Sequence, residues 1–395
     1  MRLLTFVLLA AAAGRSYCLT LTSEHSDSTQ DCDEQSAAYD AKACLMLSLG
    51  MSMTKLNVSV SSSTAAVHLM RSAGCSKMMK IFTIPEIEEL FPSLKGCHLT
   101  TYAGFLQAAI QHEPCQVKKI SQADVIFMPP YLAKECNWPS YGKGLCFSEA
   151  NMLRPGKICR QEPLEAVAKL QEKHGKPVVV VDMSSFQGID GLEKKNVWVK
   201  LNLQKSRYRA GHTISQAPPP FLPRCQLCSR RADLCYSGGL DRKQYVLTFK
   251  GSIKRNKIRS RVRHLFHSPS DKRIIVDNND TRWDYDDLLH ASKFVLILKG
   301  DADFSYRFTE AVCSGGVPVL VTSSWVPPFN EVKSFASYGI QMRESEVDKL
   351  LEVLSKYSAE DLEKLRKEAR HACETMFMSV SLQAKAMVQN VLSIV

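Results

Sequence analysis

Three polar side chains with helical spacing are the best candidates for chemistry in this chain: Ser305, Arg307 and Glu310. They follow an apolar run that predicts a buried strand (294–298), and a second apolar run comes soon after them. In doubly wound sheets, ligands bind beyond the carboxyl ends of the strands, where these side chains would lie. A cation and a carboxylate at that place suit a diphosphate and the hydroxyls of a ribose. The alternative is a surface ion pair, worth about 0.2–0.5 kcal/mol.

Glycines and basic residues in the neighbouring loops extend the predicted anion site. Arg259 and Lys250 would add positive charge from an adjacent strand end, and Gly300 lies in the loop before the helix. Fixed cations aimed at a leaving diphosphate stabilise the charge that develops as it departs. Gly315 and Gly316 predict the end of the helix. They would also let the backbone approach a nucleotide.

Two further motifs in this stretch each leave an alternative open. Asp301 and Asp303 form an Asp-x-Asp pattern, and such carboxylates can bridge a hard cation to a diphosphate. We expect arginine and lysine to do that work instead, and we predict no metal site. Pro328 and Phe329 would either wall a nucleobase site or pack in the core.

The stretch from Trp283 to Phe335 resembles the exostosin family of glycosyltransferases. The shared motifs, in the family's order, are Tyr285-Asp286 before Leu288-Leu289, the Ser305-x-Arg307-x-x-Glu310 pattern, the run from Gly316 to Val319, and Pro328-Phe329 followed by Glu331. Upstream, the run from Tyr245 to Gly251 and Arg259 match as well, and weaker landmarks begin near residue 75. The resemblance implies a GT-B fold and an inverting transfer from a UDP-linked sugar, without a cofactor, to a polysaccharide or a glycoprotein glycan.

An inverting transfer needs a general base near the acceptor hydroxyl, and we expect the first domain to supply it. Asp182 follows the apolar run 178–181, at the edge where that base should lie. His212 is a second candidate, although the family commonly has aspartate at its position. Each of the two also has a purely structural alternative.

The pattern along the chain predicts an α/β protein with two parallel-sheet domains facing a cleft. Residues 75–240 would form the acceptor side, and residues 241–395 would bind the nucleotide sugar. Strands are predicted at 125–128, 178–181, 245–249, 273–276, 294–298 and 317–322, and helices at 163–174, at 257–266 and from residues 345 and 358. The helix from residue 345 is expected to begin with a cap at Ser345.

The amino-terminal segments predict entry into the secretory pathway. Residues 1–18 combine a basic start, an apolar run and small residues, which fits a signal peptide or a short signal anchor. Residues 19–74 are rich in Ser and Thr and predict a mostly disordered stem. We therefore expect a protein of the Golgi lumen that is soluble or weakly anchored.

Cysteines and glycosylation signals agree with that compartment. We expect most of the 14 cysteines, and chiefly those from Cys75 to Cys235, to form disulfides. The alternative for Cys225-x-x-Cys228 is a zinc site, but a fourth ligand at suitable spacing is missing. Asn57 and Asn279 begin tripeptides that accept N-linked glycans.

The net charge of +11 favours anionic partners. The basic run 254–264 alone would suit nucleic acid, but in a secreted chain it better suits a diphosphate or an acidic glycan. We expect a nucleotide-sugar donor and a glycan acceptor as partners, and no nucleic acid. The rival hypothesis is a non-catalytic subunit or glycan-binding scaffold that supports a related, active glycosyltransferase subunit.

Overall fold

The computed structural model describes residues 80–84, 106, 110–111, 113, 115–128, 157–182, 196–218, 239–253, 256–267, 273–277, 283–300, 302–378 and 380–395. Several sequence predictions fall outside these residues: the signal segment, the stem, both glycosylation asparagines (Asn57 and Asn279), Asp301, and the cysteines Cys225, Cys228 and Cys235. In the described part of the chain, no helix is both long and apolar enough to span a membrane.

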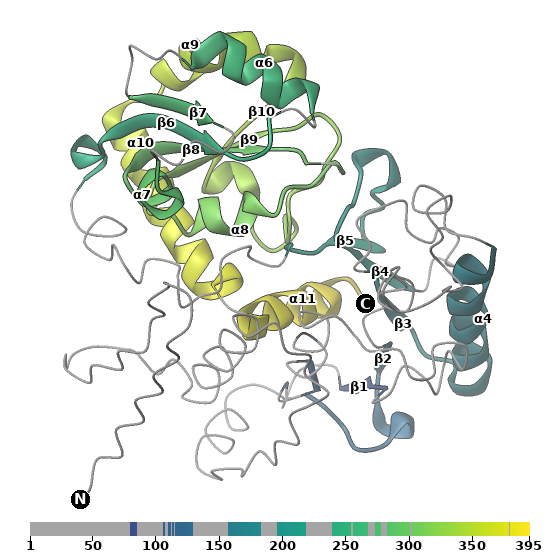
Figure 1. The fold of residues 1–395 in the computed structure, drawn as a ribbon. Coiled ribbons are helices and arrows are strands. Elements are labelled where there is room, and N and C mark those ends of the chain that lie inside the picture. The colour runs from purple at the N-terminus through teal and green to yellow at the C-terminus, as the bar shows by residue number, and fades with distance from the viewer. Residues whose placement is uncertain are drawn as a thin grey trace, which may run out of the picture.

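The first half of the described chain builds one parallel sheet with the strand order β1-β2-β3-β4-β5 (Figure 1). The strands are β1 (Ile81–Thr83), β2 (Val125–Phe127), β3 (Val178–Asp182), β4 (Val197–Lys200) and β5 (Thr213–Ser215). Every residue of β2 to β5 is buried, which suits valine-rich and isoleucine-rich strands covered on both faces. Helix α4 (Lys157–His174) precedes β3, and short 3₁₀ turns occur at η5 (Ile120–Gln122) and η9 (Lys205–Arg207).

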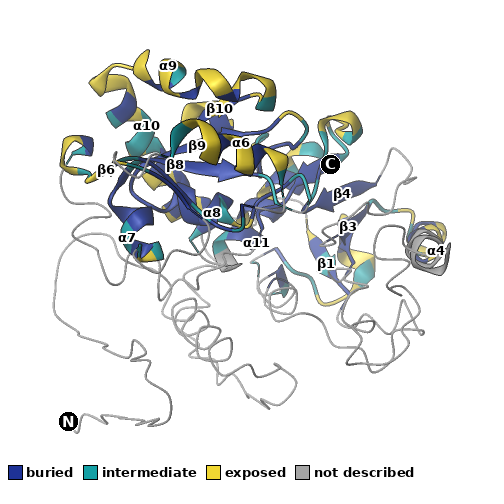
Figure 2. Ribbon diagram, turned by 45° about the horizontal axis from the view of Figure 1, so that its top comes forward, coloured by how far each residue is buried: buried dark blue, intermediate teal, exposed yellow. Residues whose placement is uncertain are grey.

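The second half builds another parallel sheet, with the strand order β10-β9-β8-β6-β7. Its strands are β6 (Tyr245–Lys250), β7 (Ile274–Asp277), β8 (Ser292–Leu298), β9 (Val317–Val321) and β10 (Ile340–Met342). Its helices are α6 (Lys257–Phe266), α7 (Tyr285–His290), α8 (Arg307–Val312), α9 (Leu350–Ser355) and α10 (Ala359–Ala372), with 3₁₀ turns η10 (Leu240–Arg242), η11 (Phe335–Ser337) and η12 (Glu344–Lys349). Most residues of the strands are buried, while the outer faces of α6, α9 and α10 are exposed (Figure 2). These two parallel-sheet domains are the GT-B type of arrangement.

The carboxyl edges of the two sheets face each other and are joined by hydrogen bonds to backbone carbonyls. The loop after β9 lies against the loop after β4, where the Val326 N–H donates to the Leu203 carbonyl (2.9 Å). The Trp325 indole N–H donates to the carbonyl of Leu201 (3.3 Å). At the end of β5, the Ser215 hydroxyl donates to the Val326 carbonyl (2.7 Å). The loops that follow the carboxyl ends of strands in both sheets therefore meet where the two domains are in contact.

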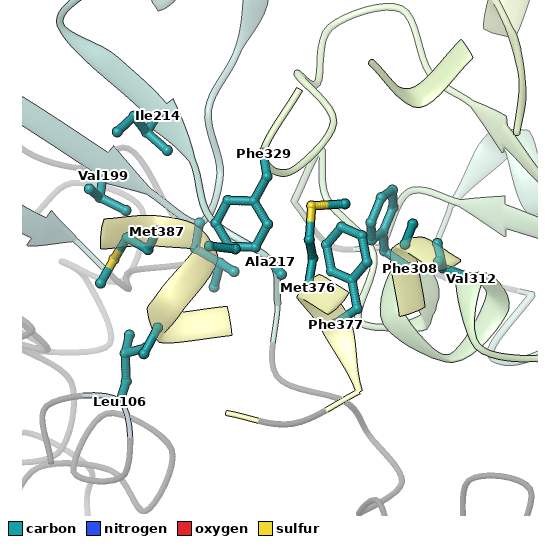
Figure 3. Close-up of a cluster of buried hydrophobic side chains, with 14 of the residues drawn as sticks. Leu106, Val199, Ile214, Ala217, Phe308, Val312, Phe329, Met376, Phe377 and Met387 are labelled. Atoms are coloured by element: carbon teal, nitrogen blue, oxygen red, sulfur yellow. The ribbon is translucent and has the colours of Figure 1, made fainter. Parts of the chain in front are cut away.

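One apolar cluster extends across both domains (Figure 3). The chain passes from α10 through the π-helical turn η13 (Cys373–Phe377) to α11 (Val380–Ile394), which lies against the first sheet. Met387 of α11 packs in the cluster with Val199 and Ile214, while Phe377 contacts Phe308 at 5.4 Å between ring centroids. The last helix of the chain therefore belongs to the core of the first domain, although it follows the second domain in sequence.

Two cysteines that lie outside the predicted disulfide cluster are bonded to each other. Cys313 at the end of α8 pairs with Cys373 at the start of η13, and both are buried. Cys115 is also disulfide-bonded. The pairing of the remaining cysteines between Cys75 and Cys235 stays a prediction.

The expected start of the helix after β10 needs correction. A 3₁₀ turn begins it at Glu344, and the carboxylate of Glu346 accepts from the backbone N–H of Arg343 (3.1 Å), so Ser345 is not the cap. Along this segment Leu351 is 37% exposed, whereas Val347 and Leu354 are buried against the core.

Candidate functional site

Arg307 lies at the carboxyl edge of the second sheet as the first residue of α8. Its Nε donates to the carbonyl of Lys250, the last residue of β6, at 2.6 Å. The guanidinium carbon lies 5.1 Å from the ring centroid of Phe249 and 5.9 Å from that of Tyr285. A Cβ at Gly251 would come within 2.4 Å of Nη2, so only glycine leaves room for the guanidinium. The cation is thus fixed in a half-buried position beside a strand end.

Glu310 is fully buried one turn further along α8, and the surface ion pair weighed for it is therefore wrong. The hydroxyl of Tyr285 donates to its Oε2 atom. Burial raises the pKa of Tyr285 well above its ordinary value of 10, and the negative charge of Glu310 is the next largest cause of this rise. Tyr285 therefore keeps its proton at neutral pH and remains a donor to Glu310.

Ser305 and Gly300 flank the loop that leads into α8. The Ser305 side chain is buried, and its hydroxyl has no hydrogen-bond partner among the described residues. A buried hydroxyl without a partner costs free energy, which makes Ser305 a candidate for contact with a ligand. The carbonyl of Gly300 accepts from the Asn256 side chain at 2.9 Å, and Asn256 also caps the amino terminus of α6. Two helices therefore begin at this loop.

Arg259 lies in the site but faces inwards. It is buried, and its guanidinium donates to three backbone carbonyls: Nη1 to Ser252 (3.0 Å), Nε to Lys299 (2.8 Å) and Nη2 to Leu298 (3.2 Å). The donors expected to meet a phosphate thus hold two loops together. On the same helix, Arg261 is exposed and bonded to Asp348.

The side chain of Lys250 also points elsewhere than predicted. Its amino group donates to the carbonyl of Trp283, and it is the Lys250 backbone that contacts Arg307. Arg307 differs from these two cations, because within the described residues its guanidinium has one backbone carbonyl as a partner, that of Lys250.

Gly315 and Gly316 lie at the other edge of the sheet from Arg307, so their position does not suit the approach to a nucleotide that was considered for them. Both follow the carboxyl end of α8, at the amino edge of the sheet, whereas Arg307 lies at its carboxyl edge. Gly315 adopts a φ of 76°, as expected at a helix end. A Cβ at Gly316 would lie 2.5 Å from the carbonyl oxygen of Ser292, the first residue of β8. The two glycines serve the turn and the close packing of β9.

Asp303 and Phe329 also turn out to join the domains. The Asp303 carboxylate accepts from the Gln204 side chain at 2.5 Å, which links the loop before α8 to the first domain. Phe329 is buried and stacks on Phe377, with 5.7 Å between the ring centroids and an angle of 22° between the ring planes. Its φ of 53° is held by a backbone bond to Ser215 (2.9 Å). Of the two alternatives for Phe329, the structure favours core packing.

The two candidate bases lie at opposite edges of the first sheet. Asp182 ends β3 at the carboxyl edge, as expected, and is 2% exposed. His212 immediately precedes β5, and its carbonyl accepts from the N–H of Trp198 at the start of β4 (2.7 Å). His212 is therefore at the amino edge, away from the second domain, and its position does not suit a base.

Sequence reasoning missed the aromatic part of the site. Phe249 and Tyr285 hold the guanidinium of Arg307, and Tyr285 holds Glu310. Tyr285 was noted only as a motif residue, and nothing in its spacing pointed to Glu310. The sequence did hold one signal for Phe249, because the predicted strand 245–249 ends on this aromatic residue and Gly251 comes soon after it. An arginine opposite an aromatic ring gains a cation–π contact.

Comparisons with known proteins agree with these motifs. Residues 25–357 match the family described as Exostosin GT47 domain. An exostosin-1 homolog of Caenorhabditis elegans is 29% identical over 164 residues, which are 36% of this chain and 43% of that protein. Exostosin-1 of Drosophila melanogaster is 29% identical over 160 residues, 35% of this chain and 21% of that protein. The matched region therefore spans less than half of each relative.

Solved structures are more distantly similar. HepE of Anabaena, in complex with UDP and glucose, is 11% identical with a TM-score of 0.34, covering 80% of this chain and 100% of its own. WaaG, a glycosyltransferase involved in lipopolysaccharide biosynthesis, is 11% identical with a TM-score of 0.31, covering 78% and 99%. Because the family match covers most of the sequence, including the residues around Arg307, this chain belongs to the exostosin GT47 family of glycosyltransferases.

Proposed function

We propose that the protein is an inverting glycosyltransferase that takes a sugar from a UDP-linked donor and adds it to a polysaccharide or a glycoprotein glycan. The observation that supports this most is the placement of Arg307, whose guanidinium is half-buried at the strand ends between Phe249 and Tyr285. A guanidinium fixed in this way binds phosphate oxygens in a bidentate manner. The luminal, Golgi location and the glycan acceptor are part of the same proposal.

In this proposal the second domain stabilises the leaving nucleotide. The acceptor hydroxyl oxygen attacks the anomeric carbon, the bond from that carbon to the diphosphate breaks, and UDP leaves with the electron pair. Negative charge on the diphosphate grows in the transition state, and Arg307 is positioned to stabilise it. The hydroxyl of Ser305, which has no hydrogen-bond partner among the described residues, supplies a further donor.

We propose that the reaction needs no divalent metal, because Arg307 supplies the positive charge that a metal would bring. The carboxylate of Asp303 is engaged with Gln204, which supports this assignment. Activity should persist in a chelator. Loss of activity with EDTA and its return with Mn²⁺ would contradict this part of the proposal.

In this proposal Asp182 is the general base that removes the proton from the acceptor hydroxyl, and it lies at the carboxyl edge of the first sheet. Asp182→Asn should lower the transfer rate by about two to four orders of magnitude and leave UDP affinity nearly unchanged. The comparison is made at equal folded fraction, checked by thermal denaturation. Near-wild-type turnover of the folded variant would exclude Asp182 as the base.

A non-catalytic subunit is the second candidate, and the burial of Asp182 favours it, because a base must meet the acceptor. A panel of nucleotide sugars separates the two hypotheses. For the enzyme, one UDP-sugar should raise the melting temperature and yield a product with the opposite anomeric configuration, seen by NMR. Stabilisation by UDP without any transfer or donor hydrolysis would support the subunit instead.

A further inference from the structure

Tyr306 is an exposed aromatic residue at the start of α8, between Ser305 and Arg307. It is 40% exposed, whereas Phe304 next to it is buried. The two rings pack edge to face, with 4.9 Å between their centroids and 75° between their planes. This contact fixes the tyrosine ring from one side and leaves part of it open to solvent.

Tyr306 and Arg307 are consecutive, but they lie against different parts of the second domain. Arg307 donates to the carbonyl of Lys250 at the end of β6. Phe304, which holds the Tyr306 ring, lies instead near Trp325 in the loop after β9, with 6.4 Å between the ring centroids. In this sheet β6 and β9 flank β8 on opposite sides. A ligand on the Tyr306 ring would therefore lie on the β9 side of the proposed phosphate site.

The β9 side of the site adjoins the first domain. Asp303, three residues before Tyr306, accepts from the side chain of Gln204 at 2.5 Å. The backbone N–H of Lys205 donates to the carbonyl of Ser324, in the loop after β9, at 2.6 Å. Tyr306 thus lies between the proposed donor site and the domain that is expected to hold the acceptor.

Two other large apolar side chains are exposed in the loops at this boundary. Tyr208 directly follows η9, and Val332 lies in the loop after β9. The two loops are in contact, because Tyr208 interacts with Glu331, the residue before Val332. Single exposed apolar residues are ordinary, but several on loops that meet indicate a surface for a ligand. A sugar ring suits tyrosine in particular, since it has an apolar face of C–H groups and an edge of hydroxyls, while tyrosine has an apolar ring and a polar tip.

We propose that Tyr306 is an acceptor-binding residue whose exposed ring stacks on the terminal sugar of the glycan acceptor. This inference rests on the proposed function, in which UDP departs from the strand end at Arg307 and the acceptor comes from the first domain. It adds to that proposal a contact for the acceptor on the second domain. Because the contact uses the apolar face of the sugar ring, it requires no charge on the acceptor.

The test compares glycan binding with UDP binding in the same variants. The wild type, saturated with UDP, is applied to an array of defined oligosaccharides, and the one that binds most strongly is then titrated by calorimetry. Tyr306→Ala should weaken the binding of this oligosaccharide about tenfold, as expected for the loss of an aromatic contact and its buried area. The Kd for UDP should not change. Tyr306→Phe keeps the ring and should retain most of the affinity for the oligosaccharide.

Tyr357→Ala is the matched control. Tyr357 lies between α9 and α10 and is also exposed, but it is not part of the candidate site. Its removal should leave the affinities for the oligosaccharide and for UDP unchanged. Thermal denaturation of every variant shows that the comparison is made on folded protein.

The contrary outcomes are distinct. Wild-type affinity for the oligosaccharide in folded Tyr306→Ala, or an equal loss in Tyr357→Ala, would overturn the inference while leaving the proposed function intact. Weakened UDP binding in Tyr306→Ala would place the ring on the donor and overturn it as well. So would a wild type that binds UDP but none of the oligosaccharides. A wild type that binds no UDP would overturn the proposed function itself.

Discussion

At the scale of single residues, two arginines that look equivalent in the sequence have different surroundings in the structure. Arg307 is half-buried and fixed by one carbonyl and two rings, whereas Arg259 is buried and bonded to three carbonyls. A guanidinium that satisfies three backbone acceptors holds the loops of the site in place. The residue types predicted an anion site, but they could not show which cation faces outwards.

We predict that Arg259→Lys destabilises the fold more than it weakens nucleotide binding. Lysine cannot reach three carbonyls in the same plane. Hydrogen bonds to charged groups contribute about 1.5–3 kcal/mol each, so the loss of one of the three should lower the free energy of unfolding by about 1.5–3 kcal/mol. Urea denaturation measures this change. A variant as stable as the wild type with strongly weakened UDP binding would make Arg259 a phosphate ligand after all.

At the scale of elements, most long strands and helices were predictable because their patterns are strong. The run 294–298 lies within β8, and the basic helix 257–266 matches α6 in both bounds. The strands β1, β4, β5 and β10 were missed, since runs of three or four residues carry little periodic signal. The packing of α11 on the first sheet was also missed, because its partners are brought together only by the fold.

The turn after α8 gives a prediction at this scale. Gly316→Ala should destabilise the protein by about 1–3 kcal/mol, because its Cβ would overlap the Ser292 carbonyl at the start of β8. Gly175→Ala is the control, since the space around that glycine is open and only its φ of 66° is unfavourable for alanine. Denaturation curves should show the larger loss for Gly316→Ala. UDP affinity should be unchanged in both variants, and a selective loss in Gly316→Ala would restore a binding role.

At the scale of the whole molecule, the two domains share a core, and the last helix also interacts electrostatically with an earlier part of the first domain. Burial raises the pKa of Glu113 in the first domain to about 7, and the charge of Lys385 on α11 partly opposes this shift. A carboxyl group with a raised pKa binds more protons in the folded than in the unfolded state, so stability must fall as pH rises. The fall should span the interval from the ordinary value, near 4.5, to about 7.

We predict that Glu113→Gln flattens this part of the stability curve and makes the protein more stable than the wild type at pH 8. Lys385→Met should act in the opposite direction, since it removes the charge that lowers the pKa of Glu113. Urea denaturation between pH 4.5 and 8, in about half-unit steps, measures both effects. A wild-type curve that is level or rising over this interval, and unchanged by Glu113→Gln, would contradict the assignment.

The most direct test of the account is calorimetric titration of UDP into the wild type, Arg307→Ala and Arg261→Ala. Arg261 is the control, because it is an exposed arginine of the same domain that is paired with Asp348. Loss of Arg307 should weaken binding by about 1.5–3 kcal/mol, which is roughly a tenfold to 150-fold rise in Kd, and Arg261→Ala should bind as the wild type does. A folded Arg307→Ala variant with wild-type affinity for UDP would contradict the claim that this strand end binds the donor.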